Sequence, residues 1–344
     1  MEKKIVNDIN DLANVLKLSI TTVSRVLNGK AEIYRISPDT KQRVLDAARE
    51  YNYIPNQLAR GLKLNKTATF GLVIPDISNP FFADIAKSIE YEARSNGYSL
   101  MLCDSRENIA LEKELINLLL SHKVEGIIVA PVGTQSEHLI QTYISGTPLV
   151  IVDRSFPEID LPSICSDNYQ GGFEAVNYLI LMGHKKIVCI QGIPESFPNK
   201  ERVHGFIDAL RNNKIPFNES MIVGKDFSLE NGYKQTRMVF SLKDPPTAIF
   251  ALSNLISLGV LQAIKEIGLK IPDDVSLISF DEQPYSAYLG TPMTTIDQKK
   301  SEMGQFAVEI LIKQIKEKDP GTKPLIMKLK TNLIIRNSVK NLKQ

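Results

Sequence analysis

The stretch that decides how this chain begins to fold is SITTVSRVLN, from Ser19 to Asn28. Ser19 is a residue type that caps helix N-termini, and Val23, Val26 and Leu27 follow on one side of the helix it would start. We therefore predict a short amphipathic helix, whose other side carries Ile20, Thr21, Ser24 and Arg25.

A second short helix is predicted just before this stretch. Asp8 can cap it, Asp11 suits its first turn, and Leu18 fills the turn that follows. Its apolar positions recur at i, i+3, i+4 and i+7: Ile9, Leu12, Ala13 and Leu16. Two such helices joined by a tight turn form a helix-turn-helix, whose second helix can enter the major groove of DNA.

A third helix completes a small all-α domain. Ser37 is its expected N-cap, Pro38 suits its first position, and its inner side is formed by Val44, Leu45, Ala47 and Ala48. A three-helix cap that binds no nucleic acid is the alternative interpretation of this pattern.

The charge of the chain is distributed unevenly. Residues 1–66 contain 12 Lys and Arg against 7 Asp and Glu, whereas the remaining residues contain 29 against 32. Because basic side chains bind phosphates, a basic start on a mildly acidic body supports the DNA interpretation. The excess is modest, so a solvated surface is the alternative.

Composition narrows the class of protein. With 344 residues, 43% of them hydrophobic and 23% charged, the chain is of ordinary globular composition and long enough for two or three domains. No apolar run is long enough to cross a bilayer, and the polar start shows no secretory signal, so we expect a cytoplasmic protein without a membrane partner. Cys103, Cys165 and Cys189 lie far apart, which indicates buried free thiols.

Residues 52–66 follow the third helix and differ from it in character. Pro55 stops that helix and Asn56 can cap a new one, in which Leu58 and Leu62 would share a face. A helix of about two turns that contains Gly61 is unstable alone, so it would form only when DNA or a second copy holds it. A plain interdomain linker is the alternative.

From residue 69 onward, short apolar runs alternate with amphipathic stretches. Runs that are apolar on both faces and alternate with helices indicate parallel sheets covered on both sides, and their number exceeds one open sheet. We therefore predict two doubly wound subdomains. The runs are 70–75, 100–103, 126–130, 149–152, 187–190, 248–251 and 275–280, and helices are expected near 81–96, 108–122, 135–145, 169–182, 200–213, 229–242, 254–268 and 300–317.

Motifs for phosphate binding, nucleophilic catalysis and metal ligation are missing, so we expect no catalytic residue, no metal and no cofactor. In a doubly wound fold the ligand lies at the carboxyl ends of the strands. The polar residues there suit a hydroxyl-rich ligand that is bound and not transformed: Asp76, Asp153, Arg154, Asp167, Asn168, Ser253, Asn254, Asp281 and Glu282. Each alone is a weak signal, because Asp and Asn are common after strands for turn reasons.

Over about residues 8–338 the chain resembles the lactose-repressor/galactose-repressor (LacI/GalR) family of transcriptional regulators. Several motifs occur in the family's order: TVSRVLNG at 22–29, YIPN at 53–56, GLVIPDISNPFF at 71–82, DR at 153–154, SDN at 166–168, PTAIF at 246–250, FDE at 280–282 and TTI at 294–296. The resemblance implies an all-α helix-turn-helix DNA-binding domain at 1–54, a hinge helix or linker at 55–67, and an effector-binding and dimerisation body at 68–344. That body would be α/β and similar to periplasmic sugar-binding proteins, with one doubly wound parallel-sheet subdomain at about 68–167 and 299–326 and the other at about 168–296 and 327–344.

The resemblance also assigns functional residues. Ile20, Thr21 and Arg25 would read bases, and Leu62 of the hinge helix would wedge into the minor groove at the centre of a palindrome. The family's DNA-contacting positions fall on Ile20, Thr21, Thr22, Ser24, Arg25, Asn28, Tyr53, Asn56, Leu58, Ala59 and Leu62. Its effector-contacting positions fall on Ile77, Asn79, Phe81, Phe82, Asp153, Ser196, Arg202, Phe227, Ser253, Asn254, Asp281 and Gln298. For Arg202, a surface arginine that pairs with a helical carboxylate is the alternative.

Three features depart from the family pattern. Lys17 stands where glycine is usual in the turn, residues 31–35 lengthen the loop before the third helix, and Asn254 replaces a common aspartate, so the effector cannot be copied from any one member. The chain ends without leucine heptads, so a tetramer held by a C-terminal coiled coil is not expected.

Together these features predict a homodimer that binds palindromic operator DNA, as a repressor in preference to an activator. A small effector, expected to be a carbohydrate, would bind between the subdomains and control operator affinity. Two other classes compete with this interpretation: a sugar-binding protein of a transport system, and an α/β enzyme. Because DNA binding weakens steeply with salt, DNA binding measured at two salt concentrations separates a regulator from both.

Overall fold

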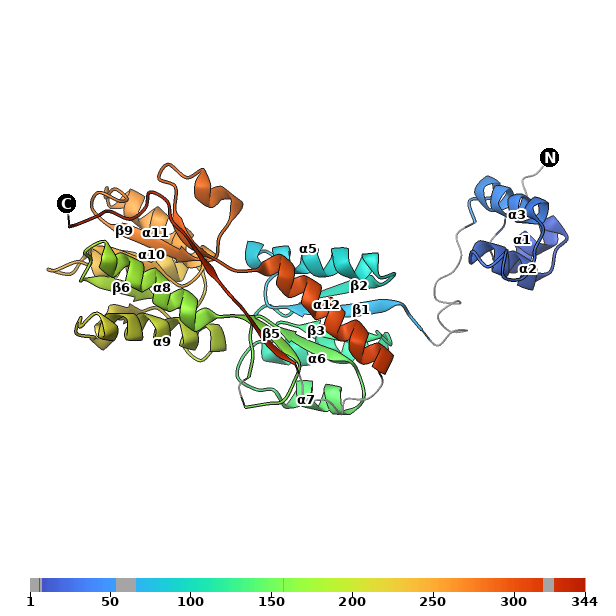
Figure 1. Cartoon of the computed structure of the whole chain (residues 1–344), viewed down its shortest axis with the longest axis horizontal. Helices are drawn as coiled ribbons and strands as arrows, with labels where there is room; N and C mark the ends of the chain where they lie inside the picture. The colour runs from blue at the N-terminus through green and yellow to red at the C-terminus, as the bar shows by residue number, and fades with distance from the viewer. Residues whose placement is uncertain (1–5, 7, 54–65, 157, 318–324, 344) are drawn as a thin grey trace. The chain divides into compact units, whose positions relative to one another are not determined.

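The computed structural model describes residues 6, 8–53, 66–156, 158–317 and 325–343. The chain forms two compact units, which we name the head (Met1–Ala68) and the body (Thr69–Gln344). In Figure 1 the head is blue, and the body runs from cyan to red. Each unit has a hydrophobic core of its own.

The head consists of three helices: α1 (Ile9–Leu16), α2 (Ile20–Leu27) and α3 (Pro38–Glu50). The predicted caps are confirmed, because Asp8, Ser19 and Ser37 accept hydrogen bonds from backbone N–H groups of their helices' first turns. Lys17 ends α1 in the left-handed conformation, with φ of 53°, and so occupies the glycine-like turn as expected. The buried core of the head comprises Leu12, Ala13, Val23, Val26, Ala31, Val44 and Ala47.

The body contains two sheets of six strands each. The first has the order β11-β5-β4-β3-β1-β2 and is parallel throughout, with Phe70 of β1 opposite both Leu100 of β2 and Gly126 of β3. Its strands are β1 (Thr69–Ile74), β2 (Ser99–Asp104), β3 (Gly126–Val129), β4 (Leu149–Val152), β5 (Ser163–Ser166) and β11 (Ile326–Leu329).

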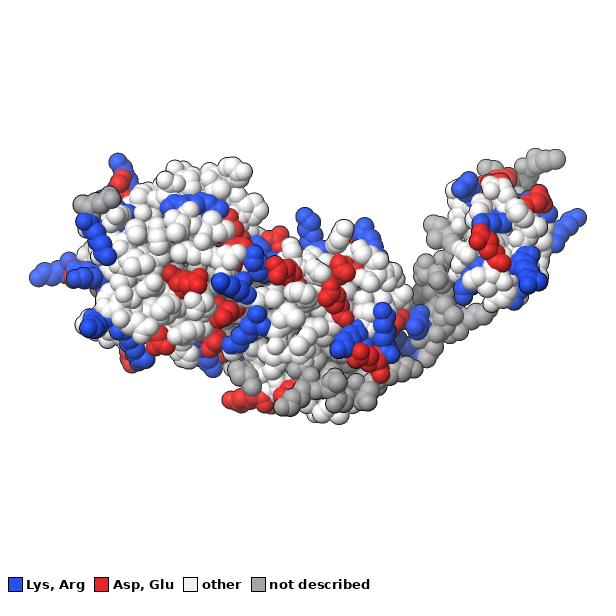
Figure 2. All heavy atoms as spheres, in the orientation of Figure 1, with Lys and Arg blue, Asp and Glu red and all other residues white. Residues whose placement is uncertain are grey.

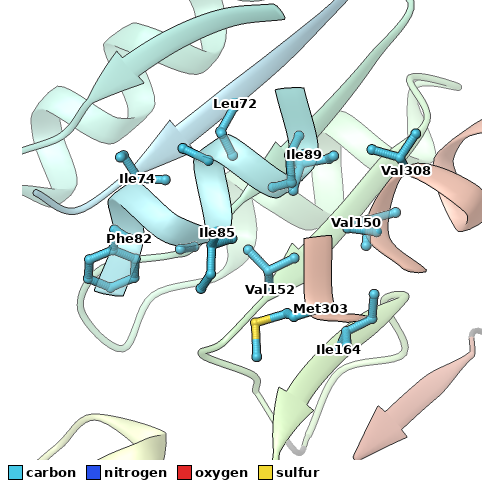
Figure 3. Close-up of a cluster of buried hydrophobic side chains, with 14 of the residues drawn as sticks. Leu72, Ile74, Phe82, Ile85, Ile89, Val150, Val152, Ile164, Met303 and Val308 are labelled. Atoms are coloured by element: carbon cyan, nitrogen blue, oxygen red, sulfur yellow. The ribbon is translucent and has the colours of Figure 1, made fainter. Parts of the chain in front are cut away.

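Helices cover both faces of this first sheet, and we name the assembly the N lobe. Figure 3 shows one face, where α5 (Pro80–Ser95) and α12 (Lys300–Glu317) pack Ile85, Ile89, Met303 and Val308 against strand residues such as Leu72. Side chains of α6 (Ile109–Ser121) and α7 (Glu137–Ile144) belong to the core of the other face. Such two-sided cover explains why the strands are apolar without alternation.

The second sheet and its helices form the C lobe. Its order is β12-β10-β9-β8-β6-β7, and it is parallel except that β12 runs antiparallel to β10. Its strands are β6 (Ile187–Ile190), β7 (Ile222–Val223), β8 (Ala248–Ala251), β9 (Ser276–Phe280), β10 (Thr294–Asp297) and β12 (Asn332–Ile334). Its helices are α8 (Asn168–Leu181), α9 (Phe197–Asn212), α10 (Leu229–Phe240) and α11 (Asn254–Glu266), with 3-10 turns η1 (Glu219–Met221) and η2 (Pro284–Ala287).

Two doubly wound lobes confirm the predicted class, but the sequence patterns missed five strands: β5, β7, β10, β11 and β12. Half of the residues of the buried strands β5 and β10 are Ser or Thr. The strands β7, β11 and β12 are short and partly exposed, so none of the five contains an apolar run of four residues. The expected boundary at 326/327 needs correction. β11 pairs with β5 in the N lobe, so the last crossover follows Leu329; in Figure 1 the red strand runs there from one lobe to the other.

Candidate functional site

The outer side of α2 is the candidate DNA interface of the head. Ile20 is 48% exposed, Thr21 is exposed, and Arg25 is half-buried, so these three side chains can meet a groove. The structure therefore brings together the three predicted base readers.

The other predicted DNA-contacting residues in and next to α2 form hydrogen bonds at the two ends of the helix. The hydroxyl groups of Thr22 and Ser19 lie 2.8 Å apart, so Thr22 takes part in the N-terminal cap. The amide nitrogen of Asn28 donates to the Ser24 carbonyl at 2.6 Å and satisfies an acceptor at the C-terminal end. These contacts hold the helix in shape, which is a structural role that a sequence pattern does not separate from DNA contact.

Tyr53 lies partly inside the head. Its ring packs on the core that contains Val44 and Ala47, its backbone N–H donates to the Ala48 carbonyl at 2.8 Å, and burial raises the pKa of its hydroxyl group. The predicted hinge residues Asn56, Leu58, Ala59 and Leu62 lie outside the residues that the structure describes.

On the face that Figure 2 shows, Lys and Arg side chains of the head are interspersed with acidic ones. Ion pairs contribute to this mixture, for example Arg49 with Asp46 at 3.8 Å. The exposed side chains on the outer side of α2 therefore identify the candidate DNA interface better than the distribution of charge does.

In the body, polar residues at the carboxyl ends of the two sheets converge on one pocket, as the doubly wound fold predicts. All but three of the predicted effector positions line it. Its lining is Asn79, Phe81, Phe82, Glu107, Asp153, Arg154, Pro198, Arg202, Phe227, Ser253, Asp281 and Gln298.

Two buried aspartates occupy equivalent places in the two lobes. Asp153 follows β4 and Asp281 follows β9, and both take the left-handed conformation, with φ of 64° and 75°. That conformation is strained for residues other than glycine, and such strain concentrates at binding sites. The backbone N–H groups donate to Ile164 and Ile296 in the neighbouring strands, which fixes each aspartate at its sheet edge.

The carboxylates of Asp153 and Asp281 differ in their hydrogen-bond partners. Asp281 accepts hydrogen bonds from the Asn254 backbone N–H and from the Gln298 amide. Among the described residues nothing bonds Oδ1 of Asp153 or Oε1 of Gln298, although both atoms are buried. Because buried polar atoms are normally paired, these two oxygens can accept hydrogen bonds from a bound molecule.

Burial raises the pKa of Asp153 to about 6, since removal from water penalises its charged form. Arg154 and Arg202 oppose this rise, whereas the nearby Asp281 and Glu107 add to it. The Asp153 carboxyl therefore changes charge within a range of pH that a solution experiment can cover.

Arg202 is buried. The alternative interpretation, a surface arginine that pairs with a helical carboxylate, is therefore wrong. Its guanidinium carbon lies 3.7 Å from the centroid of the Phe280 ring, its Nε donates to Asn168 at 2.8 Å, and one terminal nitrogen donates to the Leu252 carbonyl at 2.6 Å. A Cβ at Gly172 of α8 would come within 2.5 Å of the Arg202 carbonyl, so the close approach of α8 and α9 requires a glycine at this position.

Sequence reasoning missed Glu107 and Pro198 as lining residues, whereas it named Arg154 among the polar residues that follow strands but not among the family's effector positions. Arg154 and Glu107 form a two-toothed ion pair, with nitrogen–oxygen distances of 2.5 and 2.7 Å. The sequence alone could not identify Glu107, since it precedes a helix and reaches Arg154 only in the folded lobe.

Three predicted positions lie outside the pocket lining. Ile77 is 50% exposed, and the Ser196 hydroxyl is bonded to the Ile193 carbonyl at 2.9 Å. Asn254 links the lobes instead, because its amide nitrogen donates to Oδ1 of Asn79 at 3.0 Å. The aspartate that is common in the family at position 254 would have no N–H to donate here. Asn254 therefore permits a contact between the lobes that a carboxylate could not make.

Comparison with known proteins adds the family. Residues 6–56 match "Bacterial regulatory proteins, lacI family", and residues 67–336 match "Periplasmic binding proteins and sugar binding domain of LacI family". Among the described residues, no helix combines the length and the apolar character that a membrane crossing needs.

Individual proteins agree with this assignment. The chain is 33% identical over 336 residues to the transcriptional repressor PurR of Photobacterium profundum, covering 97% of this chain and 99% of that one. It is 35% identical over 335 residues to the repressor CytR of Escherichia coli, covering 97% and 96%. The lac repressor dimer solved with operator and an anti-inducer is similar with a TM-score of 0.86 and 27% identity, covering 98% of this chain and 100% of that one. The chain therefore belongs to the LacI family, as a DNA-binding transcriptional repressor under the control of a small effector and not as an enzyme.

Proposed function

We propose that the protein binds a palindromic operator as a homodimer in the cytoplasm, with Ile20, Thr21 and Arg25 of each copy reading one half-site. The observation that carries this proposal is the outer side of α2, where these residues are accessible while both helix ends are capped from within the head. Two copies are needed because one helix-turn-helix reads one half-site, and a two-fold dimer matches a palindrome.

Selection of double-stranded DNA from a random pool tests this proposal. We expect an enriched sequence with two-fold symmetry. Binding of the full chain to it should weaken by orders of magnitude between about 50 and 200 mM salt, because several phosphate contacts release counterions. An enriched site without symmetry, or no enrichment at all, would contradict the proposal.

We propose further that the effector is an uncharged, hydroxyl-rich molecule of the carbohydrate class. The unpaired oxygens of Asp153 and Gln298 call for hydrogen-bond donors, which hydroxyl groups supply. Carboxylates already balance the two positive charges of the pocket, because Arg154 pairs with Glu107 and Arg202 lies near Asp281 and Asp153, and this favours an uncharged effector over a phosphate. Phenylalanine side chains supply an apolar wall for the flat side of a ring: Phe81, Phe82 and Phe227.

Thermal unfolding with a panel of monosaccharides, polyols, nucleosides and sugar phosphates identifies the class. Ligand at about 100 times its dissociation constant adds about 2.7 kcal/mol, a rise in Tm of roughly 5–10 °C. We expect the rise with neutral polyhydroxylated compounds and its loss in Asp153→Asn, because the buried carboxylate acceptor is gone. Asp244→Asn, at an exposed aspartate, is the matched control. A rise in Tm with phosphates or nucleosides alone would contradict the assignment of the effector to the carbohydrate class.

The same carboxyl predicts a pH dependence. Because burial raises its pKa to about 6, Asp153 is protonated below that pH and ionised above it. In the free body the protonated form is favoured, so its contribution to stability is lost as the pH rises through about 6. A hydroxyl donor favours the ionised form, so the effector-induced rise in Tm should be larger at pH 7.5 than at pH 5. Equal rises at both pH values would exclude Asp153 as the acceptor.

Control of DNA binding follows from where the effector lies. The pocket is lined from both lobes, and Asn79 and Asn254 connect the lobes across it. An effector that prefers one relative angle of the lobes shifts their population, and this helps or hinders pairing of two hinge segments.

A further inference from the structure

A loop of the head places an aromatic ring on the arginine of α2. The guanidinium carbon of Arg25 lies 3.7 Å from the centroid of the Tyr34 ring. Tyr34 belongs to residues 31–35, which lengthen the loop before α3 relative to the usual family pattern. The ring is 47% exposed, so it forms part of the head's surface next to α2.

The loop that carries Tyr34 is a turn held by hydrogen bonds and by an ion pair. Ala31 is buried in the head's core, and its carbonyl accepts a hydrogen bond from the Ile36 N–H at 2.9 Å. The Tyr34 N–H donates to the Lys30 carbonyl at 3.2 Å, and Glu32 pairs with Lys41 of α3 at 3.3 Å. The backbone of the turn is therefore held from both ends, and the contact with Arg25 is what positions the Tyr34 ring.

Stacking and base reading use different parts of a guanidinium. The guanidinium carbon of Arg25 lies over the Tyr34 ring at contact distance. A guanidinium that stacks on an aromatic ring keeps its N–H donors in its own plane, where the ring does not block them. The two-toothed contact of arginine with guanine O6 and N7 uses those in-plane donors. A stacked Arg25 thus loses side-chain freedom without losing a donor.

We propose that Tyr34 is a positioning residue that sets the DNA specificity of Arg25. It holds the guanidinium plane before DNA arrives, so that the arginine meets one base in one orientation. The inference rests on the proposed role of Arg25 as a base reader.

The test compares full-length Tyr34→Ala and Tyr34→Phe on two DNAs of equal length, the site enriched by selection and a scrambled sequence. Tyr34→Ala should lower the ratio of the two affinities about two- to five-fold, the effect of one exposed cation–π contact. Tyr34→Phe keeps the ring and should keep the ratio. Ile33→Ala, at a neighbour that is 73% exposed, is the matched control and should also keep it.

A double-mutant cycle with Arg25→Ala separates the possible results. If Tyr34 acts through Arg25, Tyr34→Ala changes nothing further once Arg25 is alanine. Additive losses, an unchanged ratio in Tyr34→Ala, or an equal loss in Tyr34→Phe would each overturn the inference, the last because the hydroxyl group would then contact DNA itself. If Arg25→Ala alone leaves the ratio unchanged, the proposed base reader fails, and the inference fails with it for that distinct reason.

Discussion

Replacement of Arg202 by alanine is expected to destabilise the body by about 3–5 kcal/mol and to abolish the response to effector. The change removes the donors that satisfy Asn168 Oδ1 and the Leu252 carbonyl, and it leaves a gap beside the Phe280 ring. It also removes a positive charge that stabilises the ionised forms of the buried Asp153 and Asp281. Urea unfolding measures the loss, and thermal unfolding with effector measures the response.

Arg211→Ala on the same helix is the matched control. The Arg211 side chain is 67% exposed and pairs with Asp208 three residues earlier, a contact of the kind that contributes little. We expect its stability to stay within about 0.5 kcal/mol of the wild type. Wild-type stability in Arg202→Ala would show that the buried contacts are not formed in solution. Retained effector binding by calorimetry would instead remove Arg202 from the effector site.

The second large effect is expected for Arg25→Ala. Loss of a two-toothed base contact should lower the preference for the selected operator over random DNA by about 1–3 kcal/mol, or roughly 5- to 150-fold. Binding to random DNA should change much less, because that binding rests on phosphate contacts. Titrations on both DNAs at one salt concentration give the ratio directly.

Arg49→Ala is the control for charge. The Arg49 side chain is 78% exposed in the last turn of α3, and the predicted base readers belong to α2, so any effect should be equal on the two DNAs. An equal loss on both DNAs in Arg25→Ala would mean that Arg25 contacts phosphate and that bases are read by other residues.

The sequence by itself determined the elements whose causes are local. Ser19, Ser37 and Asp8 cap helices because their side chains accept from N–H groups two or three residues away. Lys17 ends α1 in the left-handed conformation, where its backbone N–H bonds to carbonyls of the last turn of the helix. All the predicted apolar runs became strands, and all but 100–103, which forms the edge strand β2, lie inside a sheet, since a strand covered on both faces requires apolar residues at every position.

Other features depended on the tertiary structure, because their causes join distant residues. Arg202 lies inside the C lobe only because Gly172 and Gly205 let α8 and α9 approach closely. Glu107 reaches Arg154 across 47 positions of sequence, and Asn254 reaches Asn79 across 175. The raised pKa of Asp153 reflects burial by both lobes. Local sequence therefore determined where each strand ends and where polar residues follow it. The packing of the two lobes decided which of those polar residues face one pocket. The burial and the charge of a side chain depend on neighbours that only the folded chain brings together.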